Sequence, residues 1–437
     1  MKKIVTVIIT IILVIVFLTH LATDDELMPE AQKWLQHYSK EPNLNQNAYV
    51  SLIALGKAGP SPYKEAKEEY LDSVSMIYKG LLDYDKQLKY PKISKLPDYN
   101  TQTKYCSMEE SGCINQMLAN RSAIDSELVL LDSILNDFLD ISTYKNFDVI
   151  NTISTVPDLG VLTSLFRFTG VKILFLINNG ELKEAANMLA SLAALDRKFL
   201  QTNTEVAFAV LPIVHYQAIY IPLIEQLIKS EFKEWDILKP VLTPLSIDEI
   251  SMNKMWLQLY ADGTKALQFK YIAEGALNKG NYLDELQARV KYKENMTFNE
   301  MFRLTKKQLI PDNLNKSKLV SEYMLADERS QQAYNELQTE RENIRWSSFK
   351  HYRNVVGHII TLTAAPRFIN IYEDKVIIDL RIMLLNVLVQ ASDMPITDVI
   401  QLPELVNPYT GEAPILESNT ICYKFSENIC TFTMQQI

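Results

Sequence analysis

The longest unbroken hydrophobic run of the sequence lies at its beginning. Residues 4–22 contain no Asp, Glu, Lys or Arg; Lys2 and Lys3 precede them, and acidic residues follow at positions 24–26. About 20 helical residues cross the hydrocarbon core of a bilayer, so this run is long enough to span a membrane. Positive charge before the run and negative charge after it place the N-terminus in the cytoplasm and the rest of the chain outside.

The end of this run indicates that it is retained. A cleaved signal peptide has a shorter apolar stretch and small residues before the cleavage site. Here the run ends in His20-Leu21-Ala22, and His20 fits the third position before a cut poorly. No cysteine lies near this point, which argues against lipoprotein processing. We therefore predict an uncleaved signal anchor over residues 1–23, with cleavage by signal peptidase as the alternative; in both cases the body is exported.

Helical periodicity dominates the rest of the chain. Apolar residues recur at intervals of three and four positions, which is the pattern of helices with one buried face. Asn178-Asn179-Gly180 is typical of the end of a helix. The sequence therefore predicts a mainly α-helical body. The expected helices cover residues 114–147, 161–177, 181–200, 206–223, 247–277, 282–294, 297–309, 320–349 and 376–391.

The best internal boundary lies at two prolines, Pro240 and Pro244. We expect an N-terminal helical region over residues 24–240 and a C-terminal helical region with a β-containing tail over residues 245–437. The helix expected at 320–349 carries Glu and Arg at helical spacing, which indicates a solvated face and not a site.

Residues 206–223 carry no formal charge and are long enough to be a second membrane span. Pro212, Pro222 and His215 are more typical of a buried, kinked core helix. A second span would also return the C-terminus to the cytoplasm, where a C-terminal disulfide would stay reduced. We therefore predict that this segment is part of the core.

The four cysteines fall into two local pairs, Cys106 with Cys113 and Cys422 with Cys430. The second pair lies in two strand-like segments around a turn-forming stretch, so a disulfide there closes a β-hairpin at its mouth. Two short crosslinked loops indicate an oxidising compartment, here the periplasm. A metal site is disfavoured, since six and seven residues separate the cysteines, against about two to four in zinc sites. Unpaired thiols are the remaining alternative.

Composition and charge narrow the class of protein. The chain has 437 residues, of which 47% are hydrophobic and 22% charged, enough to bury a sizeable core. It has only 12 glycines, which disfavours Gly-rich nucleotide-binding loops. The net charge of -9 provides no basic footprint, so we expect no nucleic acid partner.

The sequence contains no strong catalytic or metal-binding motif. It lacks H-E-x-x-H, G-x-S-x-G and the phosphate-binding G-x-x-x-x-G-K-[ST]. His351 and His358 are seven residues apart, whereas metal pairs on helices usually use spacings of about three or four. We therefore predict no metal and no cofactor. Glu110-Ser111 and Glu417-Ser418 carry the dipeptide of peptidoglycan lyases without its Gly- and Gln-rich context, and we interpret them as surface carboxylates.

Four segments occur in an order that is found elsewhere. They are Asn47-Ala-Tyr-Val-Ser-Leu-Ile-Ala-Leu-Gly56, the pair Cys106 and Cys113, Arg353-Asn-Val-Val-Gly357, and Leu402-Pro followed by Asn407-Pro-Tyr-Thr-Gly411. The chain thereby resembles a set of uncharacterised, signal-anchored, mostly helical bacterial envelope proteins, although Val355 stands where their third motif usually has proline. The resemblance implies an inner-membrane location and a helical architecture, and it implies no reaction.

The polar residues of these segments have a structural and a functional interpretation. Asn407 and Gly411 fit a tight turn, and Asn354 with Gly357 fits the end or a kink of a helix. The functional alternative is that Asn47, Asn354 and Asn407 converge on one polar groove. We favour the structural interpretation, because buried polar groups need partners before they need substrates.

Two classes of function remain. The first is a non-enzymatic scaffold or assembly protein of the cell envelope, attached to the cytoplasmic membrane through residues 4–22 and bound to an envelope protein partner. The second is an envelope hydrolase or carbohydrate-active enzyme with an unrecognised carboxylate site. A broad apolar patch away from the membrane-proximal end would favour the scaffold. A deep acidic cleft with two carboxylates about 5–9 Å apart would favour the enzyme.

Overall fold

The structure is a computed structural model, and it is mostly helical with one small antiparallel sheet near the C-terminus. The predicted mainly-α class with a β-containing tail is thereby confirmed. The predicted anchor lies outside the described residues, apart from Thr10 and Thr23. The structure describes residues 10, 23–38, 43–55, 63–68, 71, 104–147, 159–202, 206–268, 291–342, 354–363, 369–391, 396–417, 420–425 and 428–430.

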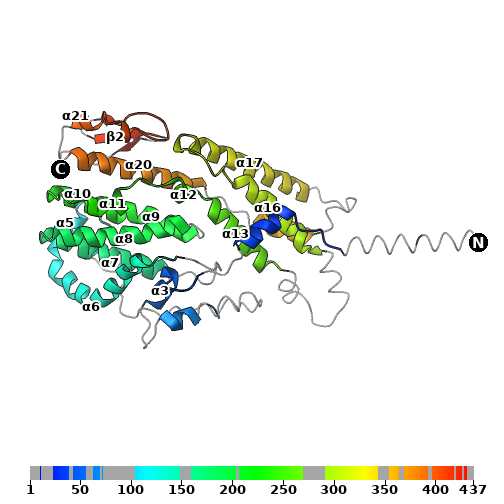
Figure 1. Ribbon diagram of the computed structural model, residues 1–437, viewed down its shortest axis with the longest axis horizontal. Coiled ribbons are helices and arrows are strands. Elements are labelled where there is room, and N and C mark those ends of the chain that lie inside the picture. Colours follow the sequence, from blue (N-terminus) through cyan, green and yellow to red (C-terminus); the bar gives the residue numbers. More distant parts are fainter. Residues whose placement is uncertain are drawn as a thin grey trace, which may run out of the picture.

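The larger part of the molecule, which we term the body, is a stack of helices around one apolar core (Figure 1). Helices α7 to α10 lie side by side, α6 covers one side of them and α20 covers another. The elements of the body are α3 (Ala48–Ala54), α5 (Cys113–Ala119), α6 (Arg121–Asp140), η1 (Ile141–Thr143), α7 (Leu159–Asn178), α8 (Leu182–Thr202), α9 (Val206–His215), η2 (Tyr216–Tyr220), α10 (Ile221–Lys229), η3 (Trp235–Leu238), α11 (Lys239–Leu242), α12 (Ile247–Ile250) and α20 (Ile369–Ala391).

The turn between α7 and α8 follows from its sequence. Gly180 has a φ of +81°, a conformation that glycine adopts without steric cost. The Glu181 N–H donates to the Leu176 carbonyl and the Gly180 N–H donates to the Ile177 carbonyl, which is the Schellman arrangement at a helix end. The predicted helix end at residues 178–180 is therefore confirmed, and it sets α7 and α8 antiparallel to each other.

Among the described residues, two helical segments are long and apolar enough to cross a membrane, Leu159–Asn178 and Val206–Lys229. Within the protein, 61% and 78% of their most apolar windows are buried. Burial of this kind is what core helices show, so length and composition alone are weak evidence for a span. The second segment agrees with the predicted core helix, and the π-helical turn η2 interrupts it between α9 and α10.

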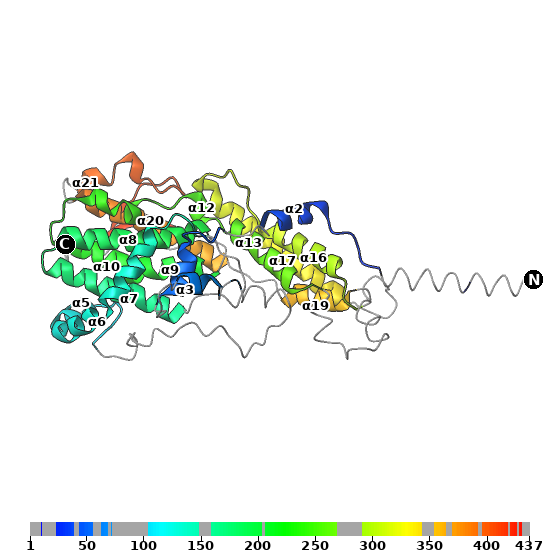
Figure 2. The ribbon, with the colours of Figure 1, turned by 60° about the horizontal axis from the view of Figure 1, so that its bottom comes forward.

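A smaller group of helices, which we term the lobe, extends from one end of the body (Figure 2). It has its own small cluster of buried residues, Ala31, Tyr260 and Phe302. Gly357 lets α19 approach α16, because an added Cβ would lie only 2.0 Å from Thr297 Oγ1. The elements of the lobe are α2 (Pro29–Tyr38), α13 (Asn253–Ala266), α16 (Glu294–Gln308), α17 (Lys316–Glu342) and α19 (Val355–Thr363).

The C-terminal tail packs on α20 and carries the sheet. The strands are β1 (Ile415–Glu417), β2 (Thr420–Lys424) and β3 (Asn428–Cys430), preceded by α21 (Ile396–Val399) and η4 (Pro403–Leu405). Cys422 of β2 is opposite Cys430 of β3, as the predicted hairpin requires. The structure adds β1, which the sequence did not predict.

The core does not divide at Pro240 and Pro244. One continuous apolar cluster contains Leu189 and Leu227 from the predicted N-terminal region and Leu380 and Tyr423 from the C-terminal region. This happens because α20 returns from the lobe to pack against α9, α10, α11 and α12. The division into an N-terminal region, residues 24–240, and a C-terminal region, residues 245–437, stays a prediction from the sequence.

Candidate functional site

Several buried charged residues lie in the body in three neighbouring groups, and we term them together the buried charge network. The groups are Asp196 with His215, Arg197 with Glu249 and Lys375, and Asp379 with the half-buried Lys316. Charged side chains are seldom buried unless they are paired, so each member needs an account of its partners.

Asp196 on α8 is fully buried and accepts two side-chain hydrogen bonds. His215 Nδ1 lies 3.0 Å from each carboxylate oxygen of Asp196, and the Tyr220 hydroxyl donates to the same group. His215 and Tyr220 are five residues apart, a spacing that an α-helix turns to different sides. The wider turn of the π-helix η2 brings both side chains to one carboxylate.

The His215 ring is held in place on its other side. It stacks on the Phe166 ring at 3.7 Å between centroids, and its Nε2 has no hydrogen-bond partner among the described residues. An Asp–His pair of this kind orients a base in nucleophilic enzymes, where a serine or cysteine lies within reach of the second ring nitrogen. Among the described residues no group lies within hydrogen-bond reach of Nε2, and the contact that the structure shows is the orientation of the ring by Asp196.

Arg197, the next residue of α8, closes the loop that leads to α12. Its Nη1 donates to Glu249 Oε2 at 2.8 Å, its Nε donates to the Pro240 carbonyl at 3.1 Å, and its Nη2 donates to the Thr243 carbonyl. Glu249 also completes a capping box with Ser246 at the start of α12. A planar guanidinium with several donors suits this role, because it satisfies three acceptors at once.

Lys375 on α20 is fully buried. Its ammonium donates to the Glu249 carbonyl at 3.0 Å. Burial lowers the pKa of Lys375 to about 7, against the opposing effect of the Glu249 charge. Lys375 is therefore poised between its charged and neutral forms near neutral pH.

Asp379 lies four residues further along α20 and joins three distant segments. One carboxylate oxygen accepts the Leu245 N–H at 2.5 Å. The other accepts Lys316 Nζ at 2.6 Å, at the start of α17, and the Tyr409 hydroxyl at 2.8 Å, in the C-terminal tail. Burial, and next the Asp379 charge, raise the pKa of Tyr409 well above its ordinary value, so its proton stays in this bond. Asp379 thus holds the loop before α12, the lobe helix α17 and the tail to the same point of α20.

The side chains of the three predicted asparagines form hydrogen bonds with backbone groups, each in a different segment of the chain. Asn47 caps the start of α3: its Oδ1 accepts the Tyr49 N–H at 2.9 Å, and its Nδ2 donates to the Asn43 carbonyl. Asn354 has a φ of +74°, and its Oδ1 accepts the Lys293 N–H at 2.8 Å, next to α16.

Asn407 forms the predicted turn in the tail. Its Oδ1 accepts the Tyr409 N–H, its Nδ2 donates to the Lys424 carbonyl at 3.0 Å, and its carbonyl accepts the Gly411 N–H. The structural interpretation of Asn407 and Gly411 is confirmed, and a common groove of Asn47, Asn354 and Asn407 stays a prediction.

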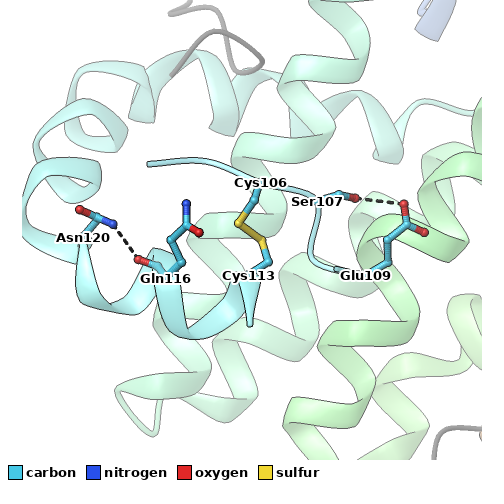
Figure 3. Close-up of a disulfide and its surroundings, with 6 residues drawn as sticks. All are labelled: Cys106, Ser107, Glu109, Cys113, Gln116 and Asn120. Atoms are coloured by element: carbon cyan, nitrogen blue, oxygen red, sulfur yellow. Dashed lines mark hydrogen bonds between the residues drawn. A yellow bond between two sulfur atoms is a disulfide. The ribbon is translucent and has the colours of Figure 1, made fainter. Parts of the chain in front are cut away.

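Both predicted disulfides are formed, Cys106–Cys113 and Cys422–Cys430. Figure 3 shows the first at the start of α5, where it closes a loop that holds Ser107 and Glu109 in a hydrogen bond of 3.1 Å. Glu110 in this loop is exposed, as expected of a surface carboxylate. Each disulfide closes a short loop, because the bonded cysteines are seven and eight positions apart in the sequence.

Two further features bear on metal and substrate binding. His358 Nδ1 lies 2.7 Å from Glu300 Oε1 between α19 and α16, and His351 lies outside the described residues. Among the described residues no group of three His, Cys, Asp or Glu side chains could hold a metal ion.

An open groove of about 740 Å³ follows α17, with all its described lining residues on that one helix. They are Asp327, Glu328, Gln331, Gln332, Asn335, Glu336 and Thr339.

The buried charge network has little signal in the amino-acid sequence. Its only signals were charged residues inside otherwise apolar helices, Asp196 and Arg197 in α8 and Lys375 with Asp379 in α20. Comparisons with protein-family models, with curated proteins and with solved structures found no match. The network therefore has to be interpreted from its own geometry, which is that of a structural junction.

Proposed function

We propose that this chain is a bacterial envelope protein of the scaffold or assembly kind, anchored in the cytoplasmic membrane by residues 4–22 with its body in the periplasm. The observation that carries this proposal is the way in which the segment after the apolar run is fixed to the lobe. Asp24 accepts the backbone N–H groups of Asn295 and Met296 at 2.8 and 3.2 Å. These belong to the first turn of α16, where the helix dipole favours a carboxylate.

The residues after Asp24 are also hydrogen-bonded to α16. Asn295 Nδ2 donates to the Asp25 carbonyl, and Asn299 Nδ2 donates to the Glu26 carbonyl, at 2.8 and 2.9 Å. Asn299 Oδ1 also accepts the Met28 N–H at 2.8 Å. The backbone of residues 25–28 is therefore bound along α16 by two side-chain amides, with no free linker between residue 24 and the lobe.

Helix α2 continues this attachment with apolar contacts. The Trp34 ring lies 4.4 Å from the Phe302 ring and 6.3 Å from the Tyr260 ring, both in edge-on arrangements. A chain fixed from residue 24 onward keeps the lobe at a set height above a membrane in which residues 4–22 are embedded. Such a junction suits a protein that presents a surface to a partner at that height.

Two observations support the location and the non-enzymatic class. All four cysteines are in disulfides, which fits an oxidising compartment. The buried carboxylates of the network are committed to structural partners, Asp196 to His215, Glu249 to Arg197 and Asp379 to Lys316.

The test uses the full-length protein in the bacterium that encodes it. A second version carries a cleavable signal in place of residues 1–22, which releases the same body into the periplasm. We expect the full-length protein to stay with the membrane after a carbonate wash, to be digested by protease in spheroplasts, and to crosslink to an envelope protein. Loss of that crosslink in the released version supports the scaffold. A body protected from protease in spheroplasts, or unchanged crosslinking after release, would overturn the proposal.

A further inference from the structure

The outer face of α6 exposes two adjacent large apolar side chains. Val129 and Leu130 are 74% and 75% exposed, more than any other large hydrophobic residue in the described part of the chain. Their neighbours Leu128 and Leu131 are buried against the body, so α6 is already fixed without them. Single exposed apolar residues are ordinary, but Val129 and Leu130 are the two most exposed large hydrophobic residues of the described chain and are adjacent on α6.

The residues between this pair are small. At helical spacing, Ser126 and Ser133 lie between Val129 and Leu130 on the outer face. Ser126 donates its hydroxyl to the Ser122 carbonyl at 3.0 Å, so this group does not compete for an outside partner. Small serine side chains between two aliphatic ones leave room for the ridge of another helix to pack between Val129 and Leu130.

The charge at one end of this face is unbalanced. Asp137 and Asp140 lie in the last turn of α6, where no basic residue is present and where the helix dipole disfavours carboxylates. Neither forms an ion pair with a described residue. The other acidic residues of α6 are all paired with cations, as Asp125–Arg121, Glu127–Lys104 and Asp132–Lys172. The C-terminal end of the face therefore has a negative potential that a cation would relieve.

We propose that the α6 face, made of Ser126, Val129, Leu130, Ser133, Asp137 and Asp140, binds an amphipathic helix of an envelope protein, one that carries Lys or Arg beside its apolar stripe. This inference rests on the proposed function and names the chemistry of its partner. In both ribbon views α6 lies at the end of the molecule opposite α2 and α16 (Figures 1 and 2). With residues 4–22 in the membrane, this end points away from the lipid, so a protein helix and not a bilayer is the occupant.

The test places a photoreactive amino acid at Val129 of the full-length protein, in the bacterium that encodes it. The matched control places it at Met324 of α17, which is 58% exposed beside another exposed residue, Leu325. We expect a discrete adduct from Val129 that Met324 does not give, and the crosslinked peptide, sequenced by mass spectrometry, should be an amphipathic segment rich in Lys or Arg.

The charge part of the inference is tested by a double variant. Asp137→Asn with Asp140→Asn should lower the yield of this adduct about five-fold, as expected for two exposed ion pairs. Asp327→Asn with Glu328→Gln on α17 is the control and should leave it unchanged. An adduct with a second copy of this chain, with lipid or with an acidic peptide, equal adducts at both positions, or no adduct overturns the inference. Carbonate washing of the same cells tests the anchor separately, so loss of the α6 adduct from protein that stays in the membrane counts against the α6 face alone.

Discussion

The body and the lobe are held together in different ways. The body has a large continuous apolar core, and the buried charge network crosses it at the points where distant segments meet. The lobe has a buried cluster of only three described residues, and polar side chains of Asp24, Asn299 and Asn354 join its segments through backbone groups.

This difference predicts a difference in cooperativity. Large apolar burial makes a unit unfold as a whole, whereas a region with few buried contacts opens locally at lower free energy. We expect the lobe to open while the body remains folded, and we expect damage to the network to affect the whole chain. The two regions depend on each other at the start of α17, where Asp379 of the body binds Lys316 and where Leu319 and Tyr323 belong to the apolar core of the body.

The largest effect is expected from Asp379→Ala. The substitution leaves Lys316 Nζ, the Tyr409 hydroxyl and the Leu245 N–H without their common acceptor in a buried site. Removing one member of a buried ion pair typically costs about 3–5 kcal/mol of unfolding free energy. Urea unfolding of the full-length protein in detergent micelles measures this loss, and limited proteolysis should show the tail released first.

The control is Asp132→Ala, which removes an exposed ion pair with Lys172 on the surface of the same body. A pair of that kind contributes about 0–1 kcal/mol. If both variants lost the same small amount, the network would not be what joins α20, α17 and the tail.

The second effect concerns pH and Lys375. The pKa of this lysine is lowered from 10.5 to about 7 in the folded protein, so between these values the unfolded chain holds a proton that the folded protein lacks. The unfolding free energy therefore rises with pH across this window, by up to about 1.4 kcal/mol per pH unit. Below about pH 7 both states are protonated, and the dependence ends.

Lys375→Met removes this titration. Between pH 7.5 and pH 9.5, values that we choose to fall inside the window, the stability of the parent protein should rise relative to the variant. Lys318→Met, at an exposed position of α17, is the matched control and should keep the parent slope. Parallel curves for the parent and Lys375→Met would show that Lys375 stays charged in the fold.

The third effect is confined to the lobe. In Gly357→Ala the new methyl group would meet Thr297 Oγ1 at 2.0 Å and Asn354 Oδ1 at 2.2 Å, so α19 must move away from α16. Overpacking of this kind costs about 1–3 kcal/mol. Hydrogen exchange should show faster exchange in α16 and unchanged protection in α8, because the body does not need this contact.

Gly263→Ala is the control for Gly357→Ala. Its methyl group would meet only the Cε of Met301, at 2.8 Å, and a methionine side chain can turn aside. Faster exchange in α8 of Gly357→Ala would mean that the lobe and the body unfold together, against the comparison drawn above.

Sequence patterns predicted the local features and missed the distant ones. The helices α7 and α8, the helix end at Gly180, the turn at Asn407 and both disulfides depend on residues close together in the chain. The single helices expected over residues 114–147 and 247–277 were wrong, because the first is divided into α5, α6 and η1 and the second into α12 and α13. The buried charge network depends on pairs such as Arg197 with Glu249 and Leu245 with Asp379, 52 and 134 residues apart. Periodicity within one helix shows that a charged residue lies on a buried face, but it does not show which segment supplies the partner.

Two smaller misses have similar causes. The strand β1 has only three residues and is defined by its pairing with β2, so its own sequence carries little signal. The π turn at Tyr216–Tyr220 has no distinctive sequence. In the structure it brings His215 and Tyr220 to the same carboxylate, that of Asp196.

The smallest effect tests the junction between the lobe and the apolar run. Asp24→Ala removes the acceptor for the N–H groups of Asn295 and Met296, and loss of such a cap costs a helix about 0.5–2 kcal/mol. Because Asp24 is exposed, we expect the lower end of this range and a change limited to α16 and α2. Hydrogen exchange of the full-length protein measures it: the first turn of α16 should exchange faster while α8 stays protected. Glu26→Ala is the matched control, since Asn299 binds the carbonyl of Glu26 and not its side chain. Unchanged exchange in α16 of Asp24→Ala would mean that the Asp24 side chain does not fix the chain to this helix, and the proposed fixed height above a membrane would rest on Asn295 and Asn299 alone.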